Sequence, residues 1–530
     1  MRPIFRTVVA GSATAALTVV GLASPALASH DGYTAASGRP GDETIVVPIN
    51  DSEAGGTYYQ PFERAYDGET PDGTPVFVYV PVGALTGVTG VHSLDPMFDH
   101  NTADKFVPCA EQDPEDYRLT LDQITYLGDQ LSDQIVRVDE EHFGPMDAAV
   151  LNDPSSDSLV TLVYNVQDEN YYDCAVDTYT AGYFAPEFMT SMGMNVITLD
   201  AFDWANRVGS PGDPVWTDDG DTTNDRPELY EGVIAHELEH LLMNYSDSGE
   251  LSWVDEGLAD MAAFLNGYDM TGSHLTYQQV FHRETSLTRW GGGLENYGAS
   301  FSYFAYLWEQ AGGNGDGMTP DQEYGPVAGD LLIKLIFENQ ADGMEGVQAA
   351  IDAYNADDST TTVLRSAEDL FRDWAVAMYV DDEGSTTFDL QNFNLGTDSG
   401  GWTIDVANDE FWDNRGNYSG NQPEAKWSRS KNRPAGTALP FGVSYEKFSN
   451  PGRYVSLEFD GANTTSVRAP DGSTHFWGGY TSQSETILEA NGLPTGDLGG
   501  QTLTFANWHF IEDGWDYGFV EALVGGVWQT

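Results

Sequence analysis

The hydrophobic residues of the chain follow two periods. Apolar positions three and four residues apart predict helices over residues 117–144, 298–313, 327–340, 344–355 and 366–380. Apolar and β-branched runs of strand length predict strands at 74–85, 158–166, 194–202 and 452–462. The middle of the chain therefore reads as a mixed sheet followed by helices, whereas short strands between Gly, Asn and Asp turns dominate near its end.

With 530 residues, the chain is too long for one compact domain, and we expect two or three. The patterns divide it into 1–28, a signal peptide; 29–110, a β-rich or propeptide-like region; 111–395, an α+β domain; and 396–530, a β-sandwich domain.

The first 28 residues have the features of a secretory signal peptide. Arg2 and Arg6 precede an apolar run, and Ala26, Leu27 and Ala28 form a small-residue cleavage site. No later segment is apolar for the roughly 18 residues that a spanning helix needs. We therefore expect a secreted, extracellular protein that does not bind a membrane.

Acidic residues far outnumber basic ones. Lys and Arg number 22 against 84 Asp and Glu, a net charge of −62; without the signal peptide, which carries two arginines and no acid, the balance is 20 against 84, or −64. Nucleic acid and anionic membranes would be repelled, while 40% hydrophobic and 12% aromatic residues argue for folded cores. We hypothesise an adaptation to saline media, where salt screens the repulsion between surface carboxylates.

The chain has two cysteines, Cys109 and Cys174. Secretion permits a disulfide between them, and two unpaired buried thiols are the alternative. Neither lies in a CxxC motif, which argues against thiol chemistry.

The stretch "YEGVIAHELEHLLMNYSDSGELSWVDEGLAD" contains the strongest chemical signal. In a helix, His236 and His240 lie one turn apart on one face and can bind one ion. Glu237 can hold a metal-bound water without being a ligand itself. Two neutral imidazoles for Zn²⁺ and a carboxylate base for its water are the chemistry of H-E-x-x-H.

Zinc needs a third protein ligand. The H-x-x-G-x-x-H continuation fails, because Met243 and Ser246 stand where Gly and His would be. Glu256, in a following helical segment, is the prediction, with Asp255 as the alternative that points about 100° away. Asp260, four residues after Glu256, would accept the free N–H of a zinc-binding histidine.

These motifs resemble those of a known family. "HELEH" followed by "WVDEGLAD" is similar to the gluzincin zinc metallopeptidases, and "LVTLVYNV", "GYFAPEF", "NVITLD" and "NYGASFSYFAYLWEQ" resemble the secreted hyicolysin-like peptidases. The resemblance covers roughly residues 115–380. A local resemblance of the C-terminal "WDYGFVEALV" to immune inhibitor A-like peptidases favours the β-sandwich.

The resemblance implies a thermolysin-like catalytic domain with a mixed sheet, an active-site helix and a helical C-terminal subdomain. It implies a secreted zinc endopeptidase acting on proteins or peptides, in which Glu237 takes a proton from water and delivers it to the leaving amine. Related enzymes stabilise the oxyanion with a Tyr or His. Tyr297 is the candidate here; its rivals are Tyr303, Tyr306 and His282.

Other interpretations stay open. Asp218, Asp219, Asp221 and Asp225 suit calcium by their oxygen ligands but lack the EF-hand spacing, as does "GGNGDGMTPDQE", so Ca²⁺ is a secondary prediction and a solvated loop is favoured. The alternative functions are a non-catalytic extracellular binding protein with a structural zinc, and a zinc hydrolase of non-protein substrates. The sequence leaves the oligomeric state open.

Overall fold

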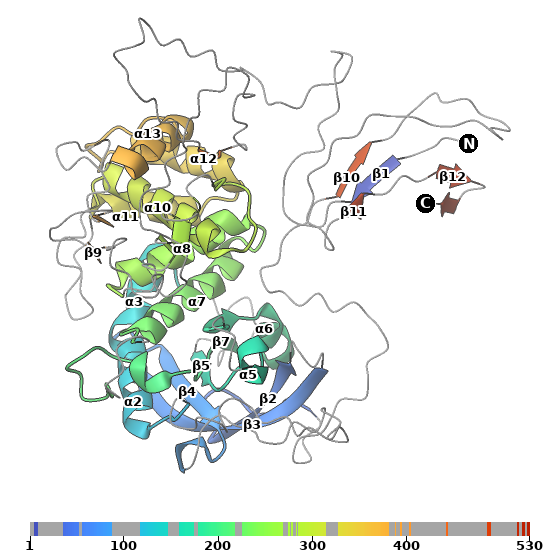
Figure 1. Cartoon of the computed structure of the whole chain (residues 1–530), viewed down its shortest axis with the longest axis vertical. Coiled ribbons are helices and arrows are strands. Elements are labelled where there is room, and N and C mark those ends of the chain that lie inside the picture. The colour runs from blue at the N-terminus through green and yellow to red at the C-terminus, as the bar shows by residue number, and fades with distance from the viewer. Residues whose placement is uncertain are drawn as a thin grey trace, which may run out of the picture.

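The fold is known from a computed structural model. It describes residues 5–8, 35–51, 56–86, 117–146, 158–173, 179–217, 225–268, 274–275, 277–278, 282, 285–313, 327–380, 387, 393–394, 402–403, 441–443, 485–488, 517–518, 522–524 and 527–529. Most of these residues form one mixed sheet and a set of helices that extends from one of its faces (Figure 1). The expected combination of a mixed sheet with several helices is confirmed.

The sheet has six strands in the order β2-β3-β4-β5-β7-β6. Their bounds are Thr44–Asp51 (β2), Gly56–Glu69 (β3), Pro75–Pro81 (β4), Leu159–Val163 (β5), Gly182–Phe184 (β6) and Asn195–Leu199 (β7). Strands β2, β3 and β4 pair antiparallel, β4, β5 and β7 pair in parallel, and β6 returns antiparallel to β7 as an edge strand. The predicted boundary between residues 110 and 111 therefore falls between neighbouring strands of a single sheet.

Alternating residues of the central strands pack into two hydrophobic cores, one on each face of the sheet. In β4, Val76, Val78 and Val80 face the larger core together with the helices, whereas Phe77 and Tyr79 face a smaller one. Every residue of β5 and β7 is buried. Burial on both faces explains why these strands are continuous apolar runs in the sequence.

The larger core is built mainly from helices that the apolar spacing predicts. They are α2 (Leu121–Gln130), the π-helical segment η2 (Leu131–Ile135), α3 (Val136–Phe143), α7 (Leu229–Ser246), α8 (Ser252–Leu265), α10 (Leu294–Gln310), α11 (Ala328–Phe337), α12 (Gly343–Ala356) and α13 (Ala367–Val380). Shorter elements are η1 (Ala84–Thr86), α5 (Glu169–Tyr172), α6 (Pro186–Met192) and η4 (Trp204–Asn206). No helix among the described residues is both long and apolar enough to cross a membrane.

Helix α7 lies between the sheet and the helices α8 and α10 (Figure 1), whereas α2 contacts β3 and β4 directly. Helix α7 contacts β6 and β7 on one side and α3 and α8 on others. The helix begins at Leu229, two residues after Pro227. It runs through Ser246, and a short turn leads to α8, which begins at Ser252. Enclosure by neighbours on several sides buries polar as well as apolar positions of α7.

Short strands at both ends of the chain complete the described structure. They are β1 (Phe5–Val8), β8 (Phe393–Asn394), β9 (Trp402–Thr403), β10 (Glu485–Leu488), β11 (Tyr517–Gly518), β12 (Ala522–Val524) and β13 (Val527–Gln529). β1, within the predicted signal peptide, pairs antiparallel with β10 and β11. Most of the predicted sandwich at 396–530 lies outside the described residues, and both the sandwich and the signal peptide stay predictions.

Candidate metal centre

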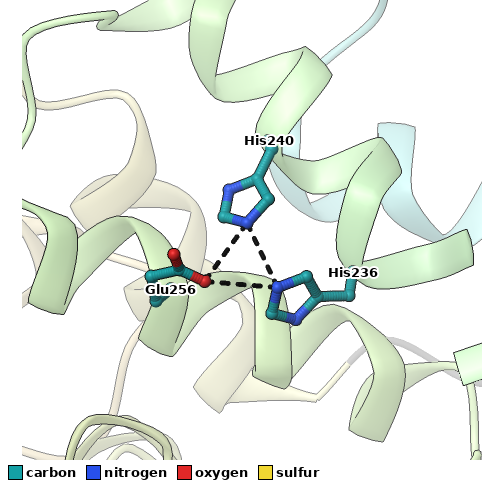
Figure 2. A group of neighbouring side chains, drawn as sticks. All are labelled: His236, His240 and Glu256. Atoms are coloured by element: carbon teal, nitrogen blue, oxygen red, sulfur yellow. Dashed lines mark hydrogen bonds and ion pairs between the residues drawn. The ribbon is translucent and has the colours of Figure 1, made fainter. Parts of the chain in front are cut away.

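Helix α7 presents two histidines toward α8. His236 and His240 are four residues apart, so their side chains share one helical face, and their ring centroids are 4.7 Å apart. His236 is 6% exposed. Glu256 on α8 meets them across the α7–α8 interface (Figure 2). The structure therefore brings together the three side chains that the sequence predicts as metal ligands.

Three ligand atoms form a nearly equilateral triangle. His236 Nε2 and His240 Nε2 are 3.1 Å apart, and each is 3.3 Å from Glu256 Oε2 (Figure 2). Donors bound tetrahedrally to one Zn²⁺ at about 2.0–2.1 Å are about 3.3 Å from one another. The triangle therefore has the dimensions of three corners of a tetrahedral zinc site, with the fourth corner left for another ligand.

The bonds on the far side of each ring fix which nitrogen carries the proton. His236 Nδ1 is 3.0 Å from Asp260 Oδ1, and His240 Nδ1 is 3.0 Å from Asp255 Oδ1. An ionised carboxylate only accepts hydrogen bonds, so each Nδ1 donates and a neutral ring turns its Nε2 lone pair toward the triangle. Glu256 Oε2 is buried and accepts no well-directed hydrogen bond from the described residues. Three ligand atoms that converge at this distance can bind one cation between them, so the residues fit a bound metal.

Asp255, the alternative third ligand, has a different position. It follows the predicted 100° offset from Glu256 along α8 and lies behind His240 instead of facing both Nε2 atoms. Asp260 contacts His236 as the sequence predicts. Each histidine thus has its own supporting carboxylate on α8.

The carboxylates around the rings favour positive charge. Burial lowers the pKa of His236, but Asp260 and Glu256 outweigh burial and raise it to about 10. Burial would raise the pKa of Glu256, yet the two histidines hold it well below its usual range. Protons and a metal ion compete for the same electron pairs, so the negative potential that attracts protons also attracts a cation.

Glu237, the predicted base, lies beside His236 at the sheet. Burial raises its pKa, against the lowering effect of His236 and His240. The backbone N–H of Phe184 in β6 donates a hydrogen bond to its carboxylate. A Cβ on Gly182 would lie 2.5 Å from Val233 Cγ1 and 3.3 Å from Glu237 Cγ. The absence of a side chain at Gly182 therefore lets β6 approach α7 where Glu237 lies.

Among the residues that could stabilise the oxyanion, Tyr297 lies beside the candidate metal ligands. Its ring centroid is 6.3 Å from that of His236, and burial followed by the charges of Glu256 and Asp260 raises its pKa well above the usual value. Tyr303 and Tyr306 are in the core instead. Their hydroxyls donate to the carbonyl oxygens of Ala367 and Thr387, at 3.2 and 2.9 Å.

His282 is the remaining candidate for stabilising the oxyanion. Its ring contacts that of Tyr277, with 5.3 Å between the centroids. No described contact joins it to His236 or His240. Tyr297 is thus the candidate that the structure places beside the histidines.

Two residues next to the site were not predicted from the sequence. His274 Nδ1 is 2.8 Å from Asp260 Oδ2, and Glu239 Oε2 is 3.6 Å from His240 Nδ1. Neither oxygen of Glu239 has a hydrogen-bond partner among the described residues. Glu239 precedes His240 directly in the sequence, whereas no periodic pattern links His274 to Asp260.

Several predictions fall elsewhere. Asp218, Asp219 and Asp221, most of the 312–323 loop, and both cysteines lie outside the described residues. Asp225 is described, just before α7, and belongs to no described group that could hold a metal. The calcium and disulfide predictions therefore stay predictions.

The geometry defines this chain as a mixed α/β protein with a candidate metal centre of two histidines and one glutamate. No family model matches the chain, and a search of the curated proteins finds no relative.

Proposed function

We propose that this protein is a secreted zinc-dependent endopeptidase of gluzincin type. The observation that carries the proposal is the triangle of His236 Nε2, His240 Nε2 and Glu256 Oε2, with a buried carboxylate, Glu237, adjacent to it in the sequence. A purely structural zinc site has no need of a base. The similarity of "HELEH" and "WVDEGLAD" to gluzincins supports the same reading.

Zinc, when bound, would act as a Lewis acid toward the scissile carbonyl and make water acidic enough to attack at neutral pH. Glu237 takes a proton from the attacking water and delivers it to the departing amine. Burial raises the pKa of this carboxyl, which suits a group that must both accept and return a proton. The Tyr297 hydroxyl donates a hydrogen bond to the oxyanion that develops at the carbonyl.

Strand β6 offers a way to hold an extended peptide. It is the last strand of the six-stranded order, and its Phe184 N–H reaches Glu237. An edge strand can bind an extended chain through main-chain hydrogen bonds with little dependence on side chains. This supports proteins and peptides as substrates.

A thermolysin-like arrangement of the catalytic domain is part of the proposal. A mixed sheet with an edge strand beside the histidine helix, followed by a helical region, supports it. We propose that the catalytic domain is similar to the hyicolysin-like peptidases, and that the C-terminal region is an accessory β-sandwich.

The test is casein cleavage by the purified full chain, with zinc content measured alongside. We expect wild type to bind one zinc and cleave, a chelator to abolish cleavage, and Glu237→Gln to keep zinc and lose at least about 100-fold in rate. Glu231→Gln is the matched control: the same change in the same helix, at a carboxyl bonded to Gly209 N and not to the histidines.

Each alternative function has its own signature in this assay. Zinc binding without hydrolysis of casein or of any peptide would favour a structural zinc in a binding protein. Hydrolysis of ester or other non-peptide substrates alone would favour a non-protein hydrolase. A wild type that binds no zinc would refute the metal centre itself.

A further inference from the structure

One carboxylate serves two histidines beside the candidate metal centre. Asp260 is fully buried. Its Oδ1 is 3.0 Å from His236 Nδ1, and its Oδ2 is 2.8 Å from His274 Nδ1. Because a carboxylate offers only acceptors, both ring nitrogens donate to it.

The second bond restricts the first. A carboxylate held by one hydrogen bond can rotate about its Cβ–Cγ bond, whereas one held on both oxygens has a fixed plane. The fixed plane sets the direction of the His236 ring, and so the direction of its Nε2 lone pair. His240 has a less enclosed support, because its partner Asp255 has a side chain that is 16% exposed.

The fold holds His274 in place from the side of α10. Its ring centroid is 4.9 Å from that of Tyr297. One residue further along α10, a Cβ on Gly298 would overlap the backbone carbonyl oxygen of His274. The helix therefore approaches the His274 backbone more closely than any residue other than glycine allows.

We propose that His274 is a positioning residue for the metal, which acts through Asp260 to fix the orientation and tautomer of His236. This inference rests on the proposed zinc site and extends it to a residue outside both metal-binding helices. Loss of His274 leaves Asp260 Oδ2 buried without its donor. The freed carboxylate can then turn away from His236, and zinc affinity falls.

The experiment measures zinc dissociation constants of the purified full chain by competition with a chromophoric chelator. We expect His274→Ala to weaken zinc binding about 10- to 100-fold, the range for loss of a partner that supports a metal ligand. His274→Asn is the matched control. Its amide N–H₂ can occupy the place of Nδ1 and donate to Asp260, so it restores most of the affinity.

A second variant reaches His274 without removing a polar group. Gly298→Ala pushes the His274 backbone away from α10. It should therefore weaken zinc binding, as His274→Ala does. The double variant His274→Ala with Gly298→Ala should bind zinc no more weakly than His274→Ala alone, since both changes act through one contact. Unfolding midpoints of the zinc-free proteins show whether each variant is folded.

The outcomes separate this inference from the proposed function. If wild type binds zinc tightly and His274→Ala binds it equally well, the positioning role is refuted while the zinc site stands. The role is refuted too if His274→Asn is as weak as His274→Ala, or if the two single effects add. A wild type with no zinc affinity refutes both.

Discussion

The Glu231 carboxyl provides a quantitative test of how burial acts in the histidine helix. It lies in the first turn of α7 and has no exposed surface. Oε1 accepts a 2.6 Å hydrogen bond from Gly209 N, and Oε2 has no hydrogen-bond partner among the described residues. Burial, only partly offset by that bond, raises its pKa from 4.5 to about 8.

The sign of the effect follows from proton binding. Below pH 4.5 the carboxyl is neutral in both the folded and the unfolded protein, so its ionisation does not change the free energy of unfolding. Between pH 4.5 and 8 the unfolded chain loses its proton while the folded protein keeps it, so the free energy of unfolding falls as pH rises. A pKa of about 8 against 4.5 amounts to about 5 kcal/mol at pH 8 and above.

Substitution Glu231→Gln removes this dependence and keeps an acceptor for Gly209 N. We expect similar stability of variant and wild type near pH 5, and a gain for the variant that grows to several kcal/mol by pH 8. The assay is urea unfolding at fixed salt and saturating zinc over this pH range. Subtracting wild type from variant cancels the titrations that the two proteins share.

Glu345→Gln provides the matched control, because Glu345 is exposed on α12 and its loss should change stability little at any pH. If the Glu231→Gln and wild-type curves run parallel from pH 5 to 8, the reasoning from burial is refuted.

Three further predictions test the site and the surface. Tyr297→Phe should lower kcat by about 10- to 100-fold, because the hydroxyl stabilises the oxyanion, and should leave zinc content intact. Unaltered turnover in a peptide assay would show that Tyr297 has no role in catalysis. Gly182→Ala should lower the rate of peptide cleavage more than zinc affinity, since its Cβ would crowd Val233 and Glu237 Cγ and displace the base; equal losses in both would contradict that. The net charge of −62 predicts an unfolding midpoint that rises with NaCl, as screening relieves repulsion; a flat or falling midpoint between low and molar salt would count against adaptation to saline media.

Local periodicity explains what could be predicted from the sequence. The meeting of His236 with His240, and the 100° offset between Asp255 and Glu256, are consequences of helical geometry alone. The approach of Glu256 to both rings needed one further assumption, that a short turn folds α8 back on α7.

Contacts made by segments without a periodic pattern escaped the same reasoning, even at short sequence separation. His274 meets Asp260 through a segment with no apolar period, and the approach depends on Gly298 in a later helix. Strand order is equally hidden, because β4 and β5 are both apolar runs and nothing in either specifies the other as its partner. The exact start of α7 also depended on tertiary contacts, since Tyr230 N bonds to the carbonyl oxygen of Arg207.

The parallel pairing of β4 with β5 has a consequence for maturation. If secretion were followed by excision of everything up to residue 110, three of the six strands would leave and β5 would become a bare edge. The larger core beneath the helices would also lose the side chains of Val76, Val78 and Val80. Removal of an N-terminal segment that leaves this sheet whole would have to end ahead of β2, so that residues 44–81 stay part of the scaffold.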